Sequence, residues 1–326
     1  MDFLKTVTIK NNAGMEAEIA NFGATILKLL VPNKQRSFTN VVVGLQHADD
    51  YLNQPYNNNF LCLGSTIGRF AGRISNSSFK IAETIYEIEN NDGVHLHGGV
   101  EGFDKKFWEF TEVLTNKAVL KYVSAHLEEG YPGNLTVEAV FEVTNENELK
   151  ITYSAITDSA TIVNITTHPY INLNGAGSII EHYLMINSGA HLEVNSKLLP
   201  TGKVKSSTDT PFDRQQMTVV GRNDFDGFDD TFVLKNNDFA AKLRSDETGI
   251  ELKVMSNQPA MVVFTPKTFP KLPFNGNYAS AYCPAICFEP QNYPDAPNQS
   301  HFPSAILQSR QKYSNEIMFQ FSVNKL

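Results

Sequence analysis

The feature that most restricts the fold of this chain is a regular alternation of apolar and other side chains. It is clearest over residues 135–143, where every odd-numbered residue is apolar, and it resumes over residues 149–155 after an Asn-Glu-Asn sequence. A period of two residues is typical of a β-strand with one buried face, because successive side chains point to opposite faces. Two such runs joined by a short polar turn predict a β-hairpin.

Shorter runs with strand character lie along the rest of the chain and are separated by Gly, Asn, Asp and Pro. They cover residues 17–22, 24–32, 40–45, 79–89, 118–127, 241–245, 250–256 and 260–266. No sustained helical period is present, and helix is expected only as short segments at residues 47–53 and 303–311. The pattern therefore predicts an all-β fold, a large β-sandwich built as one domain over residues 1–326.

The overall charge narrows the classes of partner. The 326 residues carry a formal net charge of −8, and no run of lysine or arginine stands out. We therefore expect neither a nucleic acid nor an anionic membrane as a partner, whereas a neutral small molecule would not be repelled. No apolar run reaches the length of a membrane span.

The N-terminal residues and the cysteines bear on the cellular compartment. The stretch MDFLKTVTIKNNAG lacks the long apolar core of a signal peptide. Cys62, Cys283 and Cys287 form a sparse, odd set, which favours reduced thiols in a cytoplasm over a disulfide framework. Cys283 and Cys287 could form half a zinc site, but no second Cys or His pair is near them, so buried thiols are expected.

Two glycine-rich stretches carry paired basic residues. In GRFAGRISN, Arg69 and Arg73 each follow a glycine, and a guanidinium fixed there could reach hydroxyls or a carboxylate. In GVHLHGG, His95 and His97 would point to one face of a strand, where two imidazoles could bind a metal or bracket a polar ligand. The plainer alternatives are an arginine in solvent and a core histidine satisfied by hydrogen bonds.

Two further stretches place a titratable residue directly before a proline. In NITTHPYINLNG, His168 precedes a proline that pushes its backbone toward the extended region, and a strand that ends or bulges there can aim the ring into a cavity. In ICFEPQNYPDAPN, Glu289 lies in an apolar strand, and a buried carboxylate implies a partner or a catalytic role. The alternatives are a histidine that caps a turn and a glutamate in water.

An acidic stretch, DFDGFDDTFVL, adds Asp229 and Asp230. In an extended segment these two residues alternate between faces, so one of them would face inward. The spacing does not choose between them, and an ordinary acidic turn stays open.

Together these stretches resemble the aldose 1-epimerases, also called galactose mutarotases. Five motifs occur in the family's order: GRFAGRI, LHGG, THPYINLNG, GFDDTF and EPQNYPDA. The resemblance implies a large antiparallel β-sandwich, the galactose mutarotase-like supersandwich, with a sugar cleft on one face. It also implies interconversion of the α and β anomers of free hexoses such as galactose and glucose, with a small aldose as the partner and no cofactor or metal. A monomer and a homodimer both remain open.

The resemblance implies a role for each matched residue. Arg73 of GRI and Asp229 of GFDD would bind the sugar hydroxyls, and His97 of LHGG would contact the sugar near its reactive end. His168 of THPYINL would be the general acid, and Glu289 of EPQ the general base.

The chain also departs from the family pattern at three places. Gly72 stands where Asn is common, Asp230 stands where His is common, and THPYINL replaces the usual Asn-His-Ser-Tyr-Phe-Asn-Leu. These changes bear on the substrate preference.

The implied chemistry needs one base and one acid. The base takes the proton of the C1 hydroxyl while the acid protonates the ring oxygen, the ring opens, and rotation followed by closure gives the other anomer. A protonated His168 beside an ionised Glu289 would be stabilised, because opposite charges favour each other's charged form. Tyr170 or Trp108 is expected to cover the apolar face of the sugar.

Three other classes of function are weighed against this interpretation. A metal-dependent cupin-type enzyme would use His95, His97 and Glu101, which match a His-x-His-x3-Glu pattern, although no second histidine motif follows. A sugar-binding module without catalysis would need neither His168 nor Glu289. An epimerase of phosphorylated hexoses would need a basic phosphate clamp, for which the charge balance gives no support.

Overall fold

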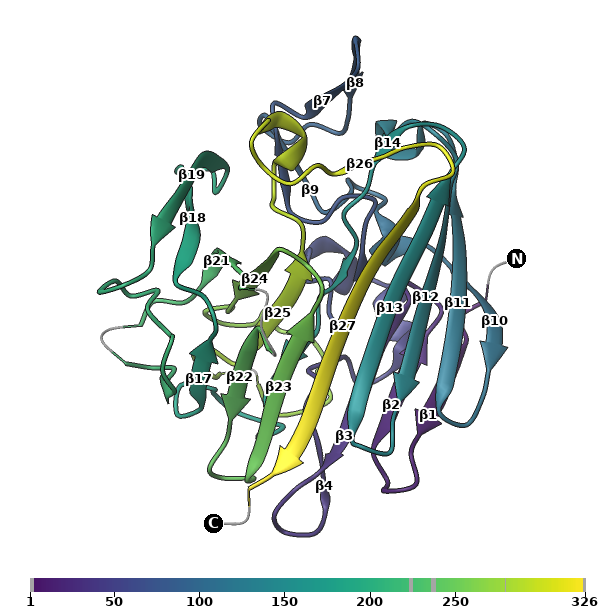
Figure 1. Ribbon diagram of the computed structural model, residues 1–326. Helices are drawn as coiled ribbons and strands as arrows, with labels where there is room; N and C mark the ends of the chain where they lie inside the picture. The colour runs from purple at the N-terminus through teal and green to yellow at the C-terminus, as the bar shows by residue number, and fades with distance from the viewer. Residues whose placement is uncertain (1–2, 223–224, 236–238, 279, 325–326) are drawn as a thin grey trace.

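The alternating sequences form the long strands of a nine-stranded antiparallel sheet, which crosses the front of the molecule in Figure 1. The computed structural model describes residues 3–222, 225–235, 239–278 and 280–324. In spatial order the strands of this sheet are β10 (Glu109–Val113), β11 (Lys117–Ser124), β12 (Leu135–Val143), β13 (Glu148–Thr157), β27 (Lys312–Val323), β23 (Ile250–Ser256), β22 (Ala241–Arg244), β17 (Tyr183–Ile186) and β20 (Thr218–Val219).

A second sheet of six strands carries the residues of greatest chemical interest. Its spatial order is β16 (Tyr170–Ile171), β25 (Ile286–Gln291), β24 (Ala260–Phe264), β21 (Asp229–Val233), β18 (Ala190–Val194) and β19 (Pro200–Ser206). A four-stranded sheet consists of β1 (Thr6–Lys10), β2 (Glu16–Ala20), β3 (Thr25–Pro32) and β4 (Phe38–Asn40).

Short pairs of strands and single 3₁₀ turns complete the described structure. The strand pairs are β5 (Thr66–Ile67) with β15 (Thr166–Thr167), β6 (Arg73–Ser75) with β9 (Val94–Leu96), β7 (Ser78–Ile81) with β8 (Thr84–Glu87), and β14 (Thr161–Ile162) with β26 (Ile306–Leu307). The 3₁₀ turns are η1 (Ala48–Leu52), η2 (Tyr56–Asn58), η3 (Phe103–Lys105), η4 (Glu128–Gly130) and η5 (Ala296–Asn298).

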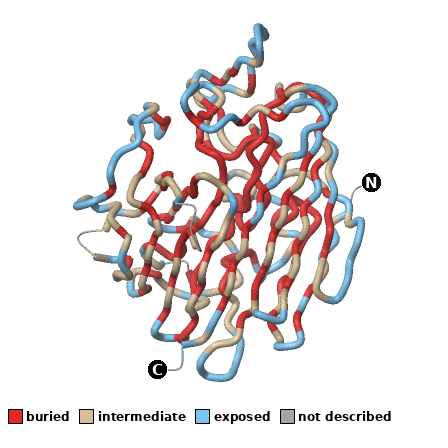
Figure 2. Tube along the Cα trace, viewed as in Figure 1, coloured by how far each residue is buried: buried red, intermediate tan, exposed pale blue. Residues whose placement is uncertain are grey.

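The large sheets share one hydrophobic core, seen as red segments inside the molecule in Figure 2. Phe141 and Ile151 of the nine-stranded sheet belong to the same buried cluster as Val263 and Phe288 of the six-stranded sheet. Each of these residues alternates along its strand with residues of the opposite face, as a sandwich requires. The predicted all-β, antiparallel sandwich is therefore confirmed.

Of the local predictions, one is confirmed and others are wrong. The hairpin is confirmed, because β12 and β13 pair from Leu135 opposite Thr157 to Val143 opposite Leu149. The predicted helix at 303–311 is wrong, since β26 lies inside it, and the predicted strand at 40–45 is reduced to isolated bridges. No helix within the described ranges is long and apolar enough to cross a membrane.

Candidate active site

One face of the six-stranded sheet forms the floor of the candidate site. Thr231, Val262 and Glu289 lie directly opposite one another on the neighbouring strands β21, β24 and β25. Two residues before Thr231 on β21, Asp229 lies opposite Phe264 of β24. Because side chains alternate along a strand, these residues share the face opposite the one that packs into the core.

A cavity of about 160 Å³ lies over this floor. Its lining includes every residue to which the family resemblance assigned a role: Arg73, His97, His168, Asp229 and Glu289. The fold therefore brings together five residues that are scattered along the sequence.

His168 reaches the cavity because the chain changes its strand partner at this residue. The preceding strand β15 pairs with β5, and the following strand β16 pairs with β25. The His168 backbone N–H donates to the Ser65 carbonyl at 3.0 Å, and the His168 carbonyl accepts from the Gly64 N–H at 3.0 Å. Pro169 has no N–H to donate, so the ladder ends there.

The two proposed acid–base residues are in direct contact. His168 Nε2 lies 3.3 Å from Glu289 Oε1, and their side chains are only 7% and 2% exposed. Burial lowers the pKa of His168 to about 4. Burial also raises the pKa of Glu289 well above its usual value, with a further upward contribution from Asp229 and a downward one from Arg73. The expected mutual stabilisation of the two charges is therefore wrong for the site without sugar, because desolvation is the larger effect.

Arg73 and His97 come from the short β6–β9 ladder. Arg73 lies opposite Leu96, the last residue of β9, so His97 follows directly beside it. The His97 N–H donates to the Gly72 carbonyl at 3.1 Å, and the Gly72 N–H donates to His97 Nδ1 at 3.2 Å. His97 has a φ of +53°, which turns the chain out of the strand at this residue.

Burial determines the charge of the His97 ring, and the hydrogen bond from Gly72 determines which ring nitrogen carries the proton. Burial lowers the pKa of His97 well below its usual value, and the charges of His168 and Arg73 lower it further. The ring is therefore neutral near pH 7, and because Nδ1 accepts a hydrogen bond, the proton resides on Nε2. His97 is thus a neutral N–H donor.

The cavity also contains a pair of opposite charges. Arg73 and Asp229 lie 3.4 Å apart, and their side chains are 23% and 30% exposed. A guanidinium that donates and a carboxylate that accepts are together suited to sugar hydroxyls, which do both.

His95 does not share the site with His97, contrary to the prediction. Its ring is fully buried, Nε2 lies 2.6 Å from the Tyr131 hydroxyl, and Nδ1 lies 3.0 Å from the Glu89 carbonyl. The physical reason is that β9 ends at Leu96, so the strand alternation does not extend to His97.

The three residues of the cupin-type metal pattern, His95, His97 and Glu101, do not come together in the structure either. Among the described residues, the only group whose donor atoms lie close enough for a metal consists of His97, His168 and Glu289, with all atoms within 4.8 Å of one another. Glu101 is outside it, and its carboxylate lies 3.8 Å from the Lys106 ammonium. The group fits a metal poorly, because His97 Nε2 holds the proton and Nδ1 is occupied by the Gly72 N–H.

Arg69 also has a structural position rather than a place in the cavity. It is 2% exposed, and its guanidinium donates to the carbonyls of Pro132 and Gly133 and to the Ser124 hydroxyl. Burial lowers its pKa to about 10. Arg69 therefore stabilises the 124–133 segment through buried hydrogen bonds.

The aromatic lining differs in part from the prediction. Tyr170 does line the cavity, and its ring stacks on His168 with centroids 5.1 Å apart. Trp108 does not, because it is buried in the core and donates to the Phe103 carbonyl. Phe264 contributes a further ring that the sequence analysis missed.

Gln291 is the main polar residue that the sequence analysis missed. It lines the cavity two residues after Glu289, so strand periodicity alone would have placed it on the same face. Its Oε1 accepts from Asn164 Nδ2 at 3.3 Å, whereas its Nε2 has no hydrogen-bond partner among the described residues. The amide donor is therefore available to a ligand.

Comparisons with known proteins agree with this geometry. The family model described as aldose 1-epimerase matches residues 5–320. Galactose mutarotase from Bos taurus is 35% identical over 95% of this chain and 92% of its own length, and aldose 1-epimerase from Escherichia coli is 29% identical over 97% and 95%. The crystal structure of an aldose epimerase homologue from C. elegans superimposes with a TM-score of 0.92 at 27% identity, covering 99% of this chain and all of that one.

Proposed function

Since the chain belongs to the aldose 1-epimerase family and interconverts the anomers of aldoses, we propose that His168 and Glu289 open and close the sugar ring as a pair that shares one proton. The observation that carries this proposal is the 3.3 Å contact between His168 Nε2 and Glu289 Oε1 on the floor of the cavity. Galactose is the proposed preferred substrate, because several relatives bear the name galactose mutarotase.

The proton balance of the reaction matches a one-proton pair. With sugar bound, the Glu289 carboxylate takes the proton of the C1 hydroxyl while the His168 imidazolium gives one to the ring oxygen, and the bond between C1 and the ring oxygen breaks. The open-chain sugar then faces a neutral Glu289 and a neutral His168. After rotation about C1–C2, each residue reverses its step, and the other anomer forms with no net gain or loss of protons.

Burial sets the resting state of this pair. In the site without sugar, a raised Glu289 pKa and a lowered His168 pKa favour the neutral form of both groups. A bound sugar donates from its C1 hydroxyl to Glu289 and accepts from His168 at its ring oxygen. Because hydrogen bonds to a charged form stabilise that form, sugar binding favours the charged form of the pair that begins ring opening.

The remaining residues hold the sugar and its developing charge. His97 presents a neutral Nε2–H that donates to an oxygen of the reacting edge, where charge develops as the ring opens. Arg73 and Asp229 bind hydroxyls farther along the ring. Gln291 supplies a further amide donor.

The proposal includes no cofactor and no metal, because no electron or group leaves the sugar. It places the protein in the cytoplasm, consistent with three cysteines that are all buried and free. The proposed reaction is compatible with either a monomer or a homodimer, because all five proposed site residues come from one chain.

Polarimetry tests the proposed function directly. Fresh α-galactose and α-glucose should lose their initial optical rotation faster with the protein than without it, after the uncatalysed rate is subtracted. A rate equal to the uncatalysed one for both sugars would overturn the proposal.

A further inference from the structure

A second cavity adjoins the catalytic one and is not used by the reaction described above. Its volume is about 320 Å³, and it shares Phe60, Leu96 and His97 with the catalytic cavity. The two spaces are therefore neighbours, separated by side chains that line both.

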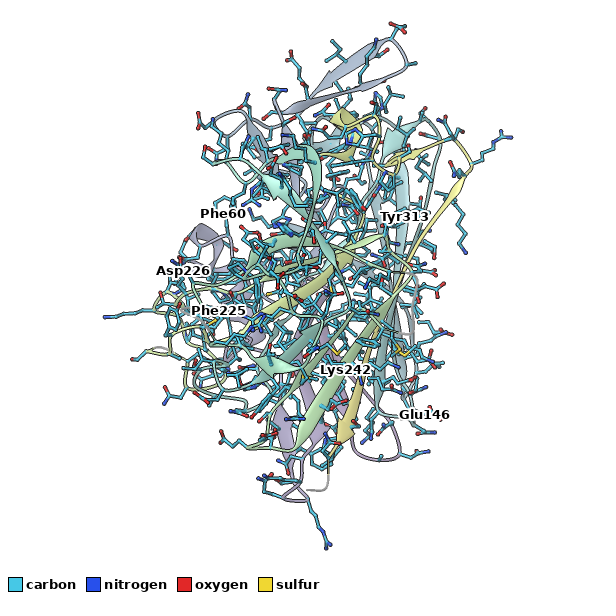
Figure 3. The ribbon with its side chains drawn as sticks, turned by 60° about the vertical axis from the view of Figure 1, so that its left-hand side comes forward. Phe60, Glu146, Phe225, Asp226, Lys242 and Tyr313 are labelled. Carbon is cyan, nitrogen blue, oxygen red and sulfur yellow. The ribbon has the colours of Figure 1, made fainter. Side chains whose placement is uncertain are left out.

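The wall of the second cavity is largely apolar. Val94 and Val100 line it together with Leu96, and Phe60 contributes an aromatic ring at its rim. Phe60 is 69% exposed and stands at the surface of the molecule in Figure 3. Apolar side chains and an exposed ring are suited to the C–H face of a sugar or to the methyl group of an acyl substituent.

The charges of the second cavity disfavour an anion. Two carboxyl groups, those of Glu89 and Asp104, line it with a single ammonium, that of Lys105. Lys105 is already engaged, because it donates to the Val100 carbonyl and lies 4.9 Å from the centre of the Phe60 ring. A phosphate would therefore meet more negative than positive charge, whereas an uncharged group with hydroxyls or an amide would find acceptors.

The position of His97 indicates which part of the sugar faces this cavity. The ring of His97 lies 5.7 Å from that of His168, so it borders the reacting edge formed by C1 and the ring oxygen. In an aldopyranose, C2 flanks C1, and C5 with its C6 substituent flanks the ring oxygen. A group on either flank is closer to His97 than a group on C3 or C4, which lie across the ring.

From this arrangement we propose that the second cavity receives an uncharged, partly apolar substituent carried on C2 or C6 of the reacting sugar. The enzyme would then accept acetamido sugars or 6-linked disaccharides as well as free hexoses. The inference rests on the proposed function, since it assumes that the sugar's reacting edge lies at His168 and Glu289.

The test compares three sugars whose reducing unit has the gluco configuration: glucose, N-acetylglucosamine, which carries an acetamido group on C2, and melibiose, in which galactose is attached to O6 of glucose. Anomeric exchange at the reducing end is followed by NMR exchange spectroscopy with the full chain. In Val100→Phe the larger side chain fills the second cavity, because Val100 lines that cavity and not the catalytic one. The matched control is Val113→Phe, since Val113 is 48% exposed against 49% for Val100 and lines neither cavity.

We expect Val100→Phe to lower kcat/KM for N-acetylglucosamine or melibiose by about tenfold or more, because a filled pocket discriminates on this scale. The kcat/KM for glucose should stay within roughly twofold in both variants, because neither Val100 nor Val113 lines the catalytic cavity, and exposed substitutions usually change stability little. The sugar that responds identifies the carbon, C2 or C6. An equal response of all three sugars, or no response of either substituted sugar, would overturn the inference.

A binding measurement separates this inference from the proposed function. Saturation-transfer NMR reports contact of the N-acetyl methyl group or of the second sugar ring with the protein, whether or not the anomers exchange. Contact that is lost in Val100→Phe and kept in Val113→Phe supports the second cavity. If glucose itself is not turned over, it is the proposed function that fails.

Discussion

The guanidinium of Arg73 lies 3.4 Å from the carboxylate of Asp229, and the two charges act on Glu289 in opposite senses. Asp229 raises the pKa of Glu289 and Arg73 lowers it, although burial is a larger cause than either. The pair proposed to hold the sugar hydroxyls therefore also adjusts the proton affinity of the proposed base.

The pH dependence of kcat/KM should be bell-shaped. The pair holds one proton between the lowered pKa of His168, about 4, and the raised pKa of Glu289. Activity on dilute sugar should rise as the pH passes the His168 pKa, about 4, and fall as it passes the Glu289 pKa. With ordinary pKa values the assignment would be reversed, because Glu would set the ascending limb and His the descending one. The two limbs belong to the coupled pair. Polarimetry with the uncatalysed rate subtracted at each pH is the measurement, and a flat profile from pH 3 to 10 would contradict the one-proton pair.

Replacing the members of the Arg73–Asp229 pair should move the descending limb in opposite directions. Asp229→Asn removes a charge that raises the Glu289 pKa, so the limb should shift to lower pH, whereas Arg73→Gln should shift it to higher pH. Asp226→Asn is the control, because its carboxylate is 81% exposed and pairs with Lys267. Shifts of the same sign in the first two variants would show that Glu289 does not set this limb.

Removing the proposed base should abolish most of the turnover. Glu289→Gln should lower kcat by about 10²–10⁴-fold, the usual contribution of general acid–base catalysis. The thermal midpoint should not fall, because a buried carboxyl with a raised pKa is replaced by a neutral group of equal shape. Glu138→Gln, at an exposed position of β12, serves as the control. A kcat near that of the wild type in Glu289→Gln would remove Glu289 from the base role.

Metal removal should leave the rate unchanged. The His97 ring offers an N–H and not a free lone pair toward His168 and Glu289, because Gly72 occupies its Nδ1. The measurement is mutarotation before and after dialysis against a strong chelator. Activity that disappears and returns with zinc or manganese would favour the metal-dependent alternative.

Arg69 should matter for stability and not for catalysis. Arg69→Lys loses several hydrogen bonds to buried carbonyls, and the free energy of unfolding should fall by roughly 3 kcal/mol. Arg244→Lys is the matched control, since Arg244 is partly exposed and pairs with Asp246. Denaturant unfolding measures the difference. A loss of kcat per folded molecule in Arg69→Lys, with unchanged stability, would place Arg69 in the reaction instead.

The sequence predicted those parts of the structure that depend on local periodicity. The hairpin over 135–157 was readable because a strand's two faces repeat every second residue. The same rule explains the error at 40–45. Val41, Val42 and Val43 are fully buried, but burial alone does not supply a neighbouring strand, and Val42 forms only an isolated bridge to Ile171.

The site was predictable by motif but not in its electrostatics. The motifs named five of the lining residues, yet the pKa directions of His168 and Glu289 depend on how deeply the fold encloses them. The same holds for His97, whose tautomer is set by one backbone N–H. The second cavity combines residues 60 and 62 with residues of the 89–105 segment, which includes β9 and η3. Only the folded chain brings these segments together, so no local pattern predicted the cavity.

The position of β27 has a consequence for how the protein is made. This strand, the yellow arrow in Figure 1, lies between β13 and β23 in the middle of the nine-stranded sheet, yet it is the last strand of the described chain. During synthesis, β10 to β13 emerge from the ribosome long before β27, so the edge of β13 has no partner strand while residues 158–311 are still being added. Unpaired strand edges promote aggregation, and long-range pairings form slowly. The nascent chain is therefore most exposed to aggregation until residues 312–323 have emerged and joined the two halves of the sheet.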